Sequence, residues 1–303
     1  MARVLIAGCG DVGSAFGSRL ALEGDAVWGL RRCPAGLPSG MQALPADLTR
    51  PETLRALPAG LDVVFYTAAA DGSNDEAYRA AYVEGLRNLL EALEAQNQRP
   101  HRVCFTSSTA VYAQSSGEWV DEGSPTEPVH FSGKRLLEAE RLLLGGRFPA
   151  TVLRLAGIYG PGRARLIDSV RQGTAVCTNG PAVYMNLIHR DDCAGALYHL
   201  MRLREPDPLY LGVDHEPVER NGLLGWLAGQ LGVRPPRVGA AAADQTSRSR
   251  SNKRCLNVKL VASGYQFRVP TFREGFAALA AGLDSCQREP PPPLLLRADP
   301  VIE

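Results

Sequence analysis

Three glycines near the start of the chain limit its possible folds more than any other feature. They are Gly8, Gly10 and Gly13, and they follow a short apolar run, Arg3–Ala7. The segment after them, Val12–Glu23, carries apolar residues at helical spacing. In a GxGxxG turn between a strand and a helix, the first glycine permits the tight turn and the second admits a pyrophosphate to the backbone. The third lets the helix pack on the strand.

This turn predicts a dinucleotide site, because the helix N-terminus after it offers free N–H groups and a positive dipole end to phosphates. We expect the residues of the turn and of the first helical turn to bind the cofactor. They are Gly8, Gly10, Asp11, Val12 and Gly13. Glycine turns also arise for packing reasons alone, and this alternative stays open.

The end of the second predicted strand, Ala26–Leu30, indicates which dinucleotide binds. NAD sites usually place an acidic residue there for the ribose 2′-hydroxyl. This chain has Arg31 and Arg32 instead. Guanidinium groups suit a 2′-phosphate, so NADP is favoured and NAD remains an alternative. Paired arginines are also common in solvated loops.

Alternating strands and helices set the fold class. Short apolar runs and helical segments follow one another, which predicts an α/β, Rossmann-like, doubly wound parallel sheet. The predicted strands are Arg3–Ala7, Ala26–Leu30, Asp62–Thr67, Val103–Thr106 and Thr151–Leu155, and the predicted helices are Val12–Glu23, Asn88–Ala95 and Lys134–Leu144. In such a sheet the ligand crevice lies at the carboxyl ends of the strands.

Beyond about residue 160 the pattern is less regular and predicts a smaller C-terminal substrate lobe. We expect a dinucleotide-binding domain over 1–160, with sheet-completing segments from about 180–215, and a mixed lobe over 161–288. Leu223–Leu231 and Phe272–Leu283 are predicted helices, and Ala240–Arg254 a mobile or poorly ordered loop. The tail over 289–303 begins with four consecutive prolines after Glu289 and is expected to be disordered.

Composition excludes several other classes of protein. The net charge is +1, so no basic field favours nucleic acid or an anionic membrane. No apolar stretch reaches the 18 or so residues of a membrane span. The seven cysteines are scattered without a CxxC pair, which argues against a metal site or a disulfide framework. We expect a cytoplasmic protein with a small-molecule substrate.

Further segments, in order, resemble the extended short-chain dehydrogenase/reductase family, which includes NAD(P)-dependent sugar epimerases and dehydratases. They are ADLT at 46–49, DVVFYTAA at 62–69, FTSSTAVY at 105–112, LRLAGIYGPG at 153–162 and NLIHRDD at 186–192. The resemblance spans roughly residues 3–285. It implies that Asp47 and Leu48 lie at the adenine, that Ala68 and Ala69 lie beside the cofactor, and that His189 anchors the substrate lobe.

The resemblance also assigns the catalytic positions, and one of them departs from the family. Ser108 matches the serine that binds the substrate oxygen, and Lys134 matches the lysine of the family's Tyr-x-x-x-Lys motif. His130 stands in place of its tyrosine, and Tyr82 in place of a supporting asparagine. Histidine titrates near ~6.5 and can act as a base without help from a lysine. His130 is equally well read as a loop residue, and Ser108 as a cap for backbone groups at a strand end.

Two functions from different classes follow. The first is an NAD(P)-dependent oxidoreductase or epimerase acting on a small hydroxyl or carbonyl compound, such as a nucleotide sugar. The second is an NADP(H)-binding sensor or scaffold with little turnover. Tyr159, Arg163 and Tyr184 are candidates for contacts with a substrate. The resemblance also implies a homodimer through the helices over Ala77–Ala95 and Lys134–Leu144.

Overall fold

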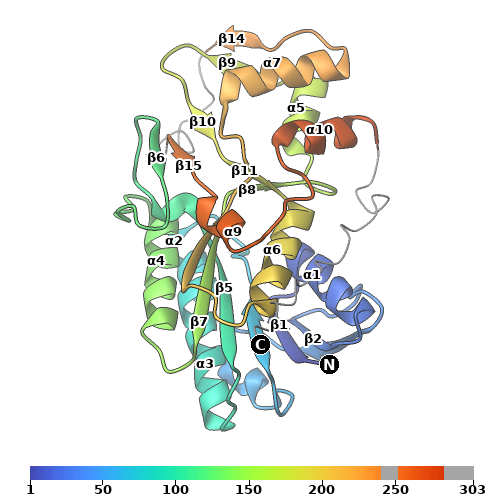
Figure 1. Ribbon diagram of the computed structural model, residues 1–303, viewed down its shortest axis with the longest axis vertical. Helices are drawn as coiled ribbons and strands as arrows, with labels where there is room; N and C mark the ends of the chain where they lie inside the picture. The colour runs from blue at the N-terminus through green and yellow to red at the C-terminus, as the bar shows by residue number, and fades with distance from the viewer. Residues whose placement is uncertain (240–251, 283–303) are drawn as a thin grey trace, which may run out of the picture.

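The computed structural model describes residues 1–239 and 252–282. Its centre is a sheet of seven strands that are all parallel, as Figure 1 shows. Across the sheet the order is β12-β7-β5-β4-β1-β2-β3. The bounds are β1 Arg3–Ala7, β2 Ala26–Arg31, β3 Met41–Pro45, β4 Val63–Tyr66, β5 Arg102–Ser108, β7 Ala150–Leu155 and β12 Leu209–Gly212. The predicted fold class is confirmed.

Burial explains why these runs form central strands. All four residues of β4 are buried, and so are five of the six residues of β7. Strands that are covered on both faces need continuous apolar runs rather than alternating ones. The strand order reverses direction between β1 and β4, and the crevice at such a point is where doubly wound sheets bind their ligands.

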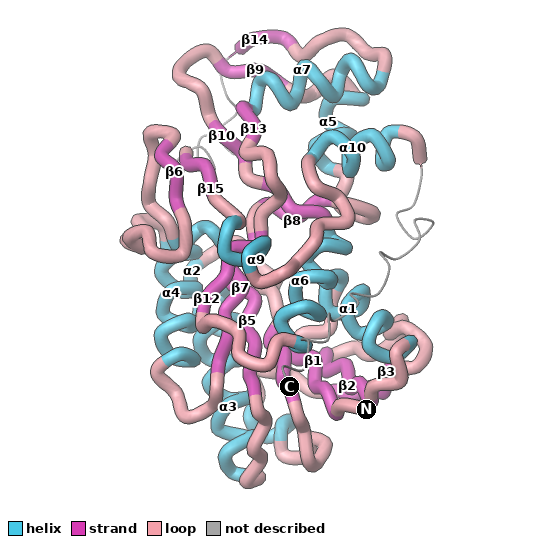
Figure 2. The backbone as a smooth tube through the Cα atoms, viewed as in Figure 1, coloured by secondary structure: helices cyan, strands magenta, loops and turns pink. Residues whose placement is uncertain are grey.

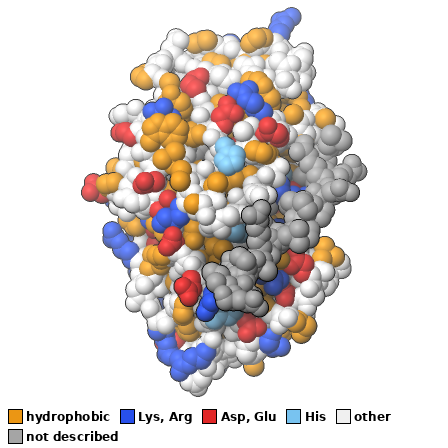
Figure 3. All heavy atoms as spheres, in the orientation of Figure 1, with side chains coloured by type: hydrophobic (Ala, Val, Ile, Leu, Met, Phe, Trp, Pro, Cys, Tyr) orange, Lys and Arg blue, Asp and Glu red, His pale blue; other side chains and the backbone are white. Residues whose placement is uncertain are grey.

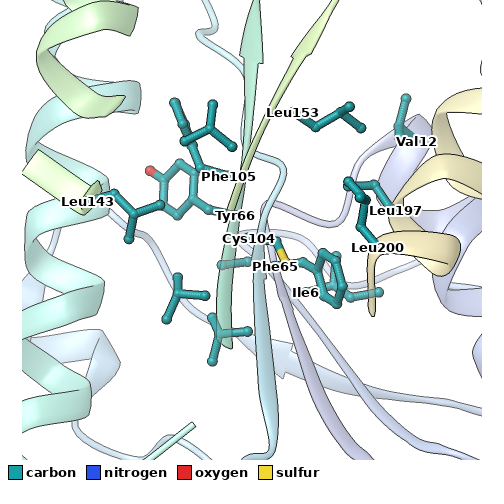
Figure 4. Packing of buried hydrophobic residues seen from close by; sticks show 14 of the residues in the cluster. Ile6, Val12, Phe65, Tyr66, Cys104, Phe105, Leu143, Leu153, Leu197 and Leu200 are labelled. Carbon is teal, nitrogen blue, oxygen red and sulfur yellow. The ribbon is translucent and has the colours of Figure 1, made fainter. Parts of the chain in front are cut away.

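Two helical layers cover the sheet. Helices α1 (Asp11–Leu22) and α6 (Arg190–Arg202) lie on one face, and α3 (Gly85–Ala95) and α4 (Phe131–Leu144) lie on the other (Figure 1). Figure 4 shows that the side chains of successive residues of β4 point toward opposite helical layers. Phe65 points toward Leu197 of α6, whereas Tyr66 points toward Leu143 of α4.

The remaining elements are short. In the part that holds the central sheet they are η1 Pro51–Leu54, α2 Asp75–Tyr78, the π-helix η2 Arg79–Glu84 and η3 Thr109–Val111. The lobe above the sheet contains α5 Arg165–Arg171, α7 Arg220–Leu231, α9 Val258–Ala262 and α10 Phe272–Ala280 (Figure 2). Its strands pair as β6 Glu118–Val120 with β15 Lys253–Cys255, β8 Gly157–Tyr159 with β11 Leu187–His189, β9 Val176–Thr178 with β14 Arg237–Gly239, and β10 Tyr184–Met185 with β13 Val218–Glu219.

The lobe has an apolar core of its own, which includes Tyr159, Leu223, Leu227 and Phe276. It is tied to the sheet domain by the buried carboxylate of Asp192. That group accepts hydrogen bonds from the Tyr265 hydroxyl at 2.7 Å and from the backbone N–H groups of Arg268 and Val269 at 2.8 and 2.9 Å. His189, the residue expected to anchor the lobe, caps α6: its side chain accepts a hydrogen bond from the N–H of Asp191 at 3.3 Å.

One predicted segment needs correction. Ala240–Arg254 was expected to be a loop, but Lys253 and Arg254 belong to β15, which pairs with β6. Residues 240–251 lie outside the described residues, as does the tail over 289–303. In the part of the chain that the structure describes, no helix is long and apolar enough to cross a membrane.

Acidic and basic side chains are interspersed over the face of the molecule that Figure 3 shows.

Candidate active site

A cleft of about 480 Å³ opens at the carboxyl ends of the central strands. It brings together segments that lie far apart in the sequence. The predicted site residues that line it are Gly8, Gly10, Asp11, Val12, Arg31, Arg32, Asp47, Leu48, Ala68, Ala69, Ser108 and Arg163. The cleft also has lining residues that the sequence analysis did not assign to the site, among them Thr49, Asp71, Tyr82, Thr106 and Ser107.

The glycine turn has the geometry that its sequence predicts. Gly8 has φ +82°, and a side chain there would overlap the backbone of Ala68. A Cβ on Gly13 would lie 2.9 Å from Oγ1 of Thr67, so only glycine lets α1 pack this closely. Gly10 precedes α1 and makes no side-chain hydrogen bond to the first N–H groups of the helix. Helix N-termini without a side-chain cap can bind a phosphate.

Asp11 brings a negative charge to the same helix N-terminus, and two arginines neutralise it. Its carboxylate lies 2.6 Å from Nε of Arg163 and 3.6 Å from Nη1 of Arg190. Arg163 follows the loop after β8, so this ion pair joins the glycine turn to the chain that enters the lobe. The guanidinium groups also place positive charge at the edge of the phosphate site.

The two arginines after β2 lie at the far end of the cleft. Arg32 forms an ion pair with Asp71 at 2.8 Å, and this neighbour raises the pKa of the guanidinium. The Arg31 side chain makes no hydrogen bond or ion pair with a described residue. Both lie where a phosphate on the adenosine ribose is expected.

Asp47 lies beside these arginines at the end that should hold the adenine. Its carboxylate accepts hydrogen bonds from the N–H of Thr49 at 2.9 Å and from the Thr49 hydroxyl at 2.7 Å. Partial burial raises the pKa of Asp47, but the bonds from Thr49 and the charge of Arg32 outweigh it, and the pKa is lowered. Asp47 is therefore a charged acceptor at neutral pH.

Hydroxyl groups gather at the opposite end of the cleft. Ser108 ends β5, where its Oγ accepts a hydrogen bond from the N–H of Ala110 at 3.2 Å. Its side chain therefore caps η3, as one interpretation of the sequence expects. The residue also lines the cleft, where a catalytic role would require it. Tyr82 of η2 is half-buried and lines the same region.

His130 and Lys134 do not share the helical face expected of them, because α4 begins at Phe131. His130 is the exposed residue before the helix, and its Nδ1 lies 2.9 Å from Oγ of Ser132 and caps the helix. Lys134 is exposed on α4. Neither is among the described residues that line the cleft. The catalytic roles of His130 and Lys134 stay predictions.

Of the three candidates for substrate contacts, only Arg163 lines the cleft. Tyr159 is 4% exposed, stacks on Phe276 and belongs to the core of the lobe. Tyr184 lies in β10, with its ring 4.8 Å from the guanidinium of Arg254. Gly13 is buried in the first turn of α1 and is likewise not a lining residue.

The sequence analysis did not find the buried polar cluster behind Ser108. Glu140 of α4 forms an ion pair with Arg154 of β7 at 2.6 Å and accepts from the Ser107 hydroxyl at 2.5 Å. Arg154 also donates to the Tyr112 hydroxyl at 2.7 Å. No local pattern in the sequence indicates this cluster, because its residues come from separate elements. Tyr82 is another cleft residue that the sequence left without a role in the site. Its position in place of the family's asparagine was the signal that could have identified it.

Comparison with known proteins gives a consistent result. The family model for the NAD-dependent epimerase/dehydratase family matches residues 4–211. Protein YeeZ of Escherichia coli K12 is 30% identical over 250 residues, which cover 78% of this chain and 86% of YeeZ. A dTDP-6-deoxy-L-talose 4-dehydrogenase (NAD(P)(+)) from Kitasatospora kifunensis is 31% identical over 169 residues, covering 52% of this chain and 53% of that enzyme.

A solved structure from Methylobacillus flagellatus, assigned to the same family, is similar along nearly the whole chain. It is 39% identical, with a TM-score of 0.76, and the match covers 93% of this chain and 98% of that one. The match therefore includes the C-terminal lobe as well as the sheet domain.

Proposed function

The chain belongs to the NAD-dependent epimerase/dehydratase family, and from that premise we propose that it is an NADP(H)-dependent oxidoreductase. Its substrate is a small compound with a hydroxyl or carbonyl group, and nucleotide-linked sugars are the first class to test. The dTDP-sugar dehydrogenase described above supports this choice of substrates.

One observation carries the proposal: a single cleft joins an uncapped helix N-terminus, two arginines and a serine hydroxyl. The N–H groups after Gly10 would hold the pyrophosphate, and the Asp47 carboxylate would accept a hydrogen bond at the adenine end of the cofactor. Ala68 and Ala69 have small side chains, which leave room for the rest of the dinucleotide beside β4. The donor set fits a nicotinamide dinucleotide from one end to the other.

When bound, the nicotinamide supplies or accepts a hydride. The chain itself must orient the substrate oxygen and move a proton. Ser108 lies in the cleft at the end of β5, where its hydroxyl can donate to that oxygen. Arg163 at the cleft edge supplies a positive charge for an anionic group of the substrate or cofactor.

Preference for NADP(H) is tested by equilibrium binding of NADP(H) and NAD(H). Replacing Arg31 and Arg32 together by alanine should weaken NADP(H) binding about 100-fold or more, because each of the two charge-assisted bonds to a phosphate contributes ~1.5–3 kcal/mol. NAD(H), which lacks that phosphate, should bind almost unchanged. Arg55→Ala is the matched control, since Arg55 is an exposed arginine outside the lining of the cleft. Equal losses for both dinucleotides would contradict the assignment.

The second candidate function is an NADP(H)-binding sensor or scaffold. It is favoured by the positions of His130 and Lys134, which leave the cleft without the family's usual Tyr–Lys pair. NADPH binding without oxidation by any carbonyl substrate would support it over the first. Homodimerisation through α3 and α4 stays a prediction that analytical ultracentrifugation can test.

A further inference from the structure

The cleft contains a tyrosine that comes from a different element than the family's motif. Tyr82 lines the cleft together with Ser108, Ala68 and Ala69. Its ring lies 6.4 Å from that of Phe105, a residue of the strand that ends at Ser108. The ring thus lies beside β5, and Tyr82 lines the same cleft as Ser108, the residue that ends that strand.

Local backbone geometry explains why this side chain faces the cleft. Tyr82 belongs to the π-helix η2, whose wider turns interrupt the helix between α2 and α3. Short π segments are often found at functional sites, since they turn a side chain away from its α-helical direction. The Tyr66 hydroxyl donates to the carbonyl of Ala81, and a Cβ on Gly85 would lie 2.5 Å from that hydroxyl. The hydrogen bond fixes η2 against β4, and the glycine at the start of α3 leaves room for the Tyr66 hydroxyl that makes it.

The surroundings of the phenol suit a proton donor. Burial and the neighbouring Tyr78 raise the pKa of Tyr82, whereas the backbone N–H of Ala70, in the segment after β4, acts in the opposite direction. The titratable groups beside it are Tyr78 of α2 and Tyr66 of β4, and burial, followed by the proximity of Tyr82, raises the pKa of Tyr66. Tyr82 is therefore a neutral phenol at pH 7, and the Ala70 N–H can stabilise its anion.

We propose that Tyr82 is the catalytic proton donor of this site, an inference that rests on the oxidoreductase function proposed above. In the reductive direction the carbonyl carbon receives a hydride from the reduced nicotinamide and is reduced, while the nicotinamide is oxidised. The π electrons of the C=O bond move to the oxygen. That oxygen takes the proton from Oη of Tyr82, and the phenolate then regains a proton from water in the open cleft. Ser108 donates a hydrogen bond to the same oxygen.

The test compares Tyr82→Phe with Tyr78→Phe. Tyr78 is the matched control, because it lies one turn away, its ring is 5.2 Å from that of Tyr82, and it does not line the cleft. NADPH oxidation is followed with 4-keto dTDP- and UDP-sugars and with small aromatic ketones. Tyr82→Phe should lower kcat by about 100-fold or more, as expected for loss of a general acid, with NADPH affinity within about threefold of wild type. Tyr78→Phe should keep wild-type rates.

Two further readouts separate a chemical role from a structural one. In the reductive direction kcat should fall only at alkaline pH, as the phenol with its raised pKa ionises, and His130→Ala should leave this pH profile unchanged. In the protein without substrate, NADP⁺ should protect Tyr82 from nitration by tetranitromethane. Tyr78 should be nitrated equally with and without NADP⁺, as read by mass spectrometry.

Each adverse outcome has a distinct meaning. Tyr82→Phe rates equal to those of Tyr78→Phe, absence of protection by NADP⁺, or a pH profile that His130→Ala changes would overturn the role of Tyr82 alone. NADPH binding without oxidation by any probe would overturn it in favour of the sensor function. Failure to bind NADPH at all would overturn the proposed function itself.

Discussion

The position of Ser108 depends on buried charged side chains behind it, each paired with an opposite charge. The clearest case is Arg154, which is 5% exposed and lies between Glu140 and Tyr112. Ser107 joins the same cluster and precedes Ser108, so these bonds hold the end of β5 against α4 and β7. The cluster therefore supports Ser108 from behind.

Replacing Arg154 by methionine should lower the free energy of unfolding by about 3–5 kcal/mol, because the buried Glu140 carboxylate loses its partner. The double variant Arg154→Met, Glu140→Leu should recover much of that loss, since it leaves no unpaired charge. Urea denaturation measures both. As a control, Arg171→Met removes an exposed pair with Asp168 and should change stability by less than about 1 kcal/mol. Equal effects at the two sites would refute the distinction.

The ion pair between Asp11 and Arg163 gives a prediction for cofactor release. It joins the glycine turn to the loop at the cleft edge, so Arg163→Gln should free that loop and remove a positive charge beside the pyrophosphate. We expect NADPH to dissociate about tenfold faster, corresponding to ~1.4 kcal/mol. Stopped-flow displacement of NADPH gives this rate. Arg171→Gln on α5 should leave it unchanged, and an unchanged rate in Arg163→Gln would argue against the bridge.

Two glycines within helices differ in how closely another element packs against them. On α4, a side chain at Gly133 would overlap the carbonyl oxygen of Ala110 in η3, the turn that Ser108 caps. On α7, a methyl group added at Gly229 would meet no atom within 4 Å. The first glycine is required by packing, whereas the second only adds conformational entropy to the unfolded chain.

Alanine at these two positions should therefore act in opposite directions. Gly133→Ala should destabilise the protein by about 1–3 kcal/mol, because α4 must move away from η3. Gly229→Ala should stabilise it by ~0.5–1 kcal/mol through helix propensity. Thermal and urea unfolding provide the comparison. Similar shifts for the two variants would mean that α4 does not depend on this close contact.

At the scale of the whole molecule, buried acids lie where the lobe meets the sheet domain. Asp214 is 2% exposed and lies two residues after β12, and among the described residues its Oδ2 has no hydrogen-bond partner. Burial, reinforced by Glu216, Asp192 and Glu274, raises its pKa to about 8. Burial also raises the pKa of Asp192 to about 6. Both carboxyls thus bind protons more tightly in the folded protein than in the unfolded chain.

This difference predicts how stability changes with pH. Because the folded state holds more protons, the free energy of unfolding should fall as pH rises from ~4 through the raised values and level off above about 8. Asp214→Asn keeps an acceptor for the N–H of Glu216 but cannot ionise. It should reduce the loss between about pH 5 and 8 by at least ~1 kcal/mol. Urea unfolding at several pH values tests this, and identical slopes for variant and wild type would exclude Asp214 as the cause.

The sequence by itself determined five of the seven strands of the sheet and three of the four helices that cover it. These features follow from short-range rules: the steric freedom of Gly8, the continuous apolar runs of parallel strands, and the helical spacing after the turn. Strand β1 was predicted to the residue, and α4 was predicted three residues short at its start. The cleft residues predicted for the cofactor lie at the end of β2 or on the segments that follow β1, β2, β3 and β4.

The tertiary structure alone decided which side chains reach the reacting end of the cleft. His130 and Lys134 share a face only if the helix includes residue 130, and α4 begins one residue later. Tyr82 faces the cleft because a π-helix interrupts the α-helical period, and no residue spacing predicted that interruption. Arg163, by contrast, meets Asp11 across 152 residues of chain. Such contacts depend on how distant elements pack, which local sequence rules do not encode.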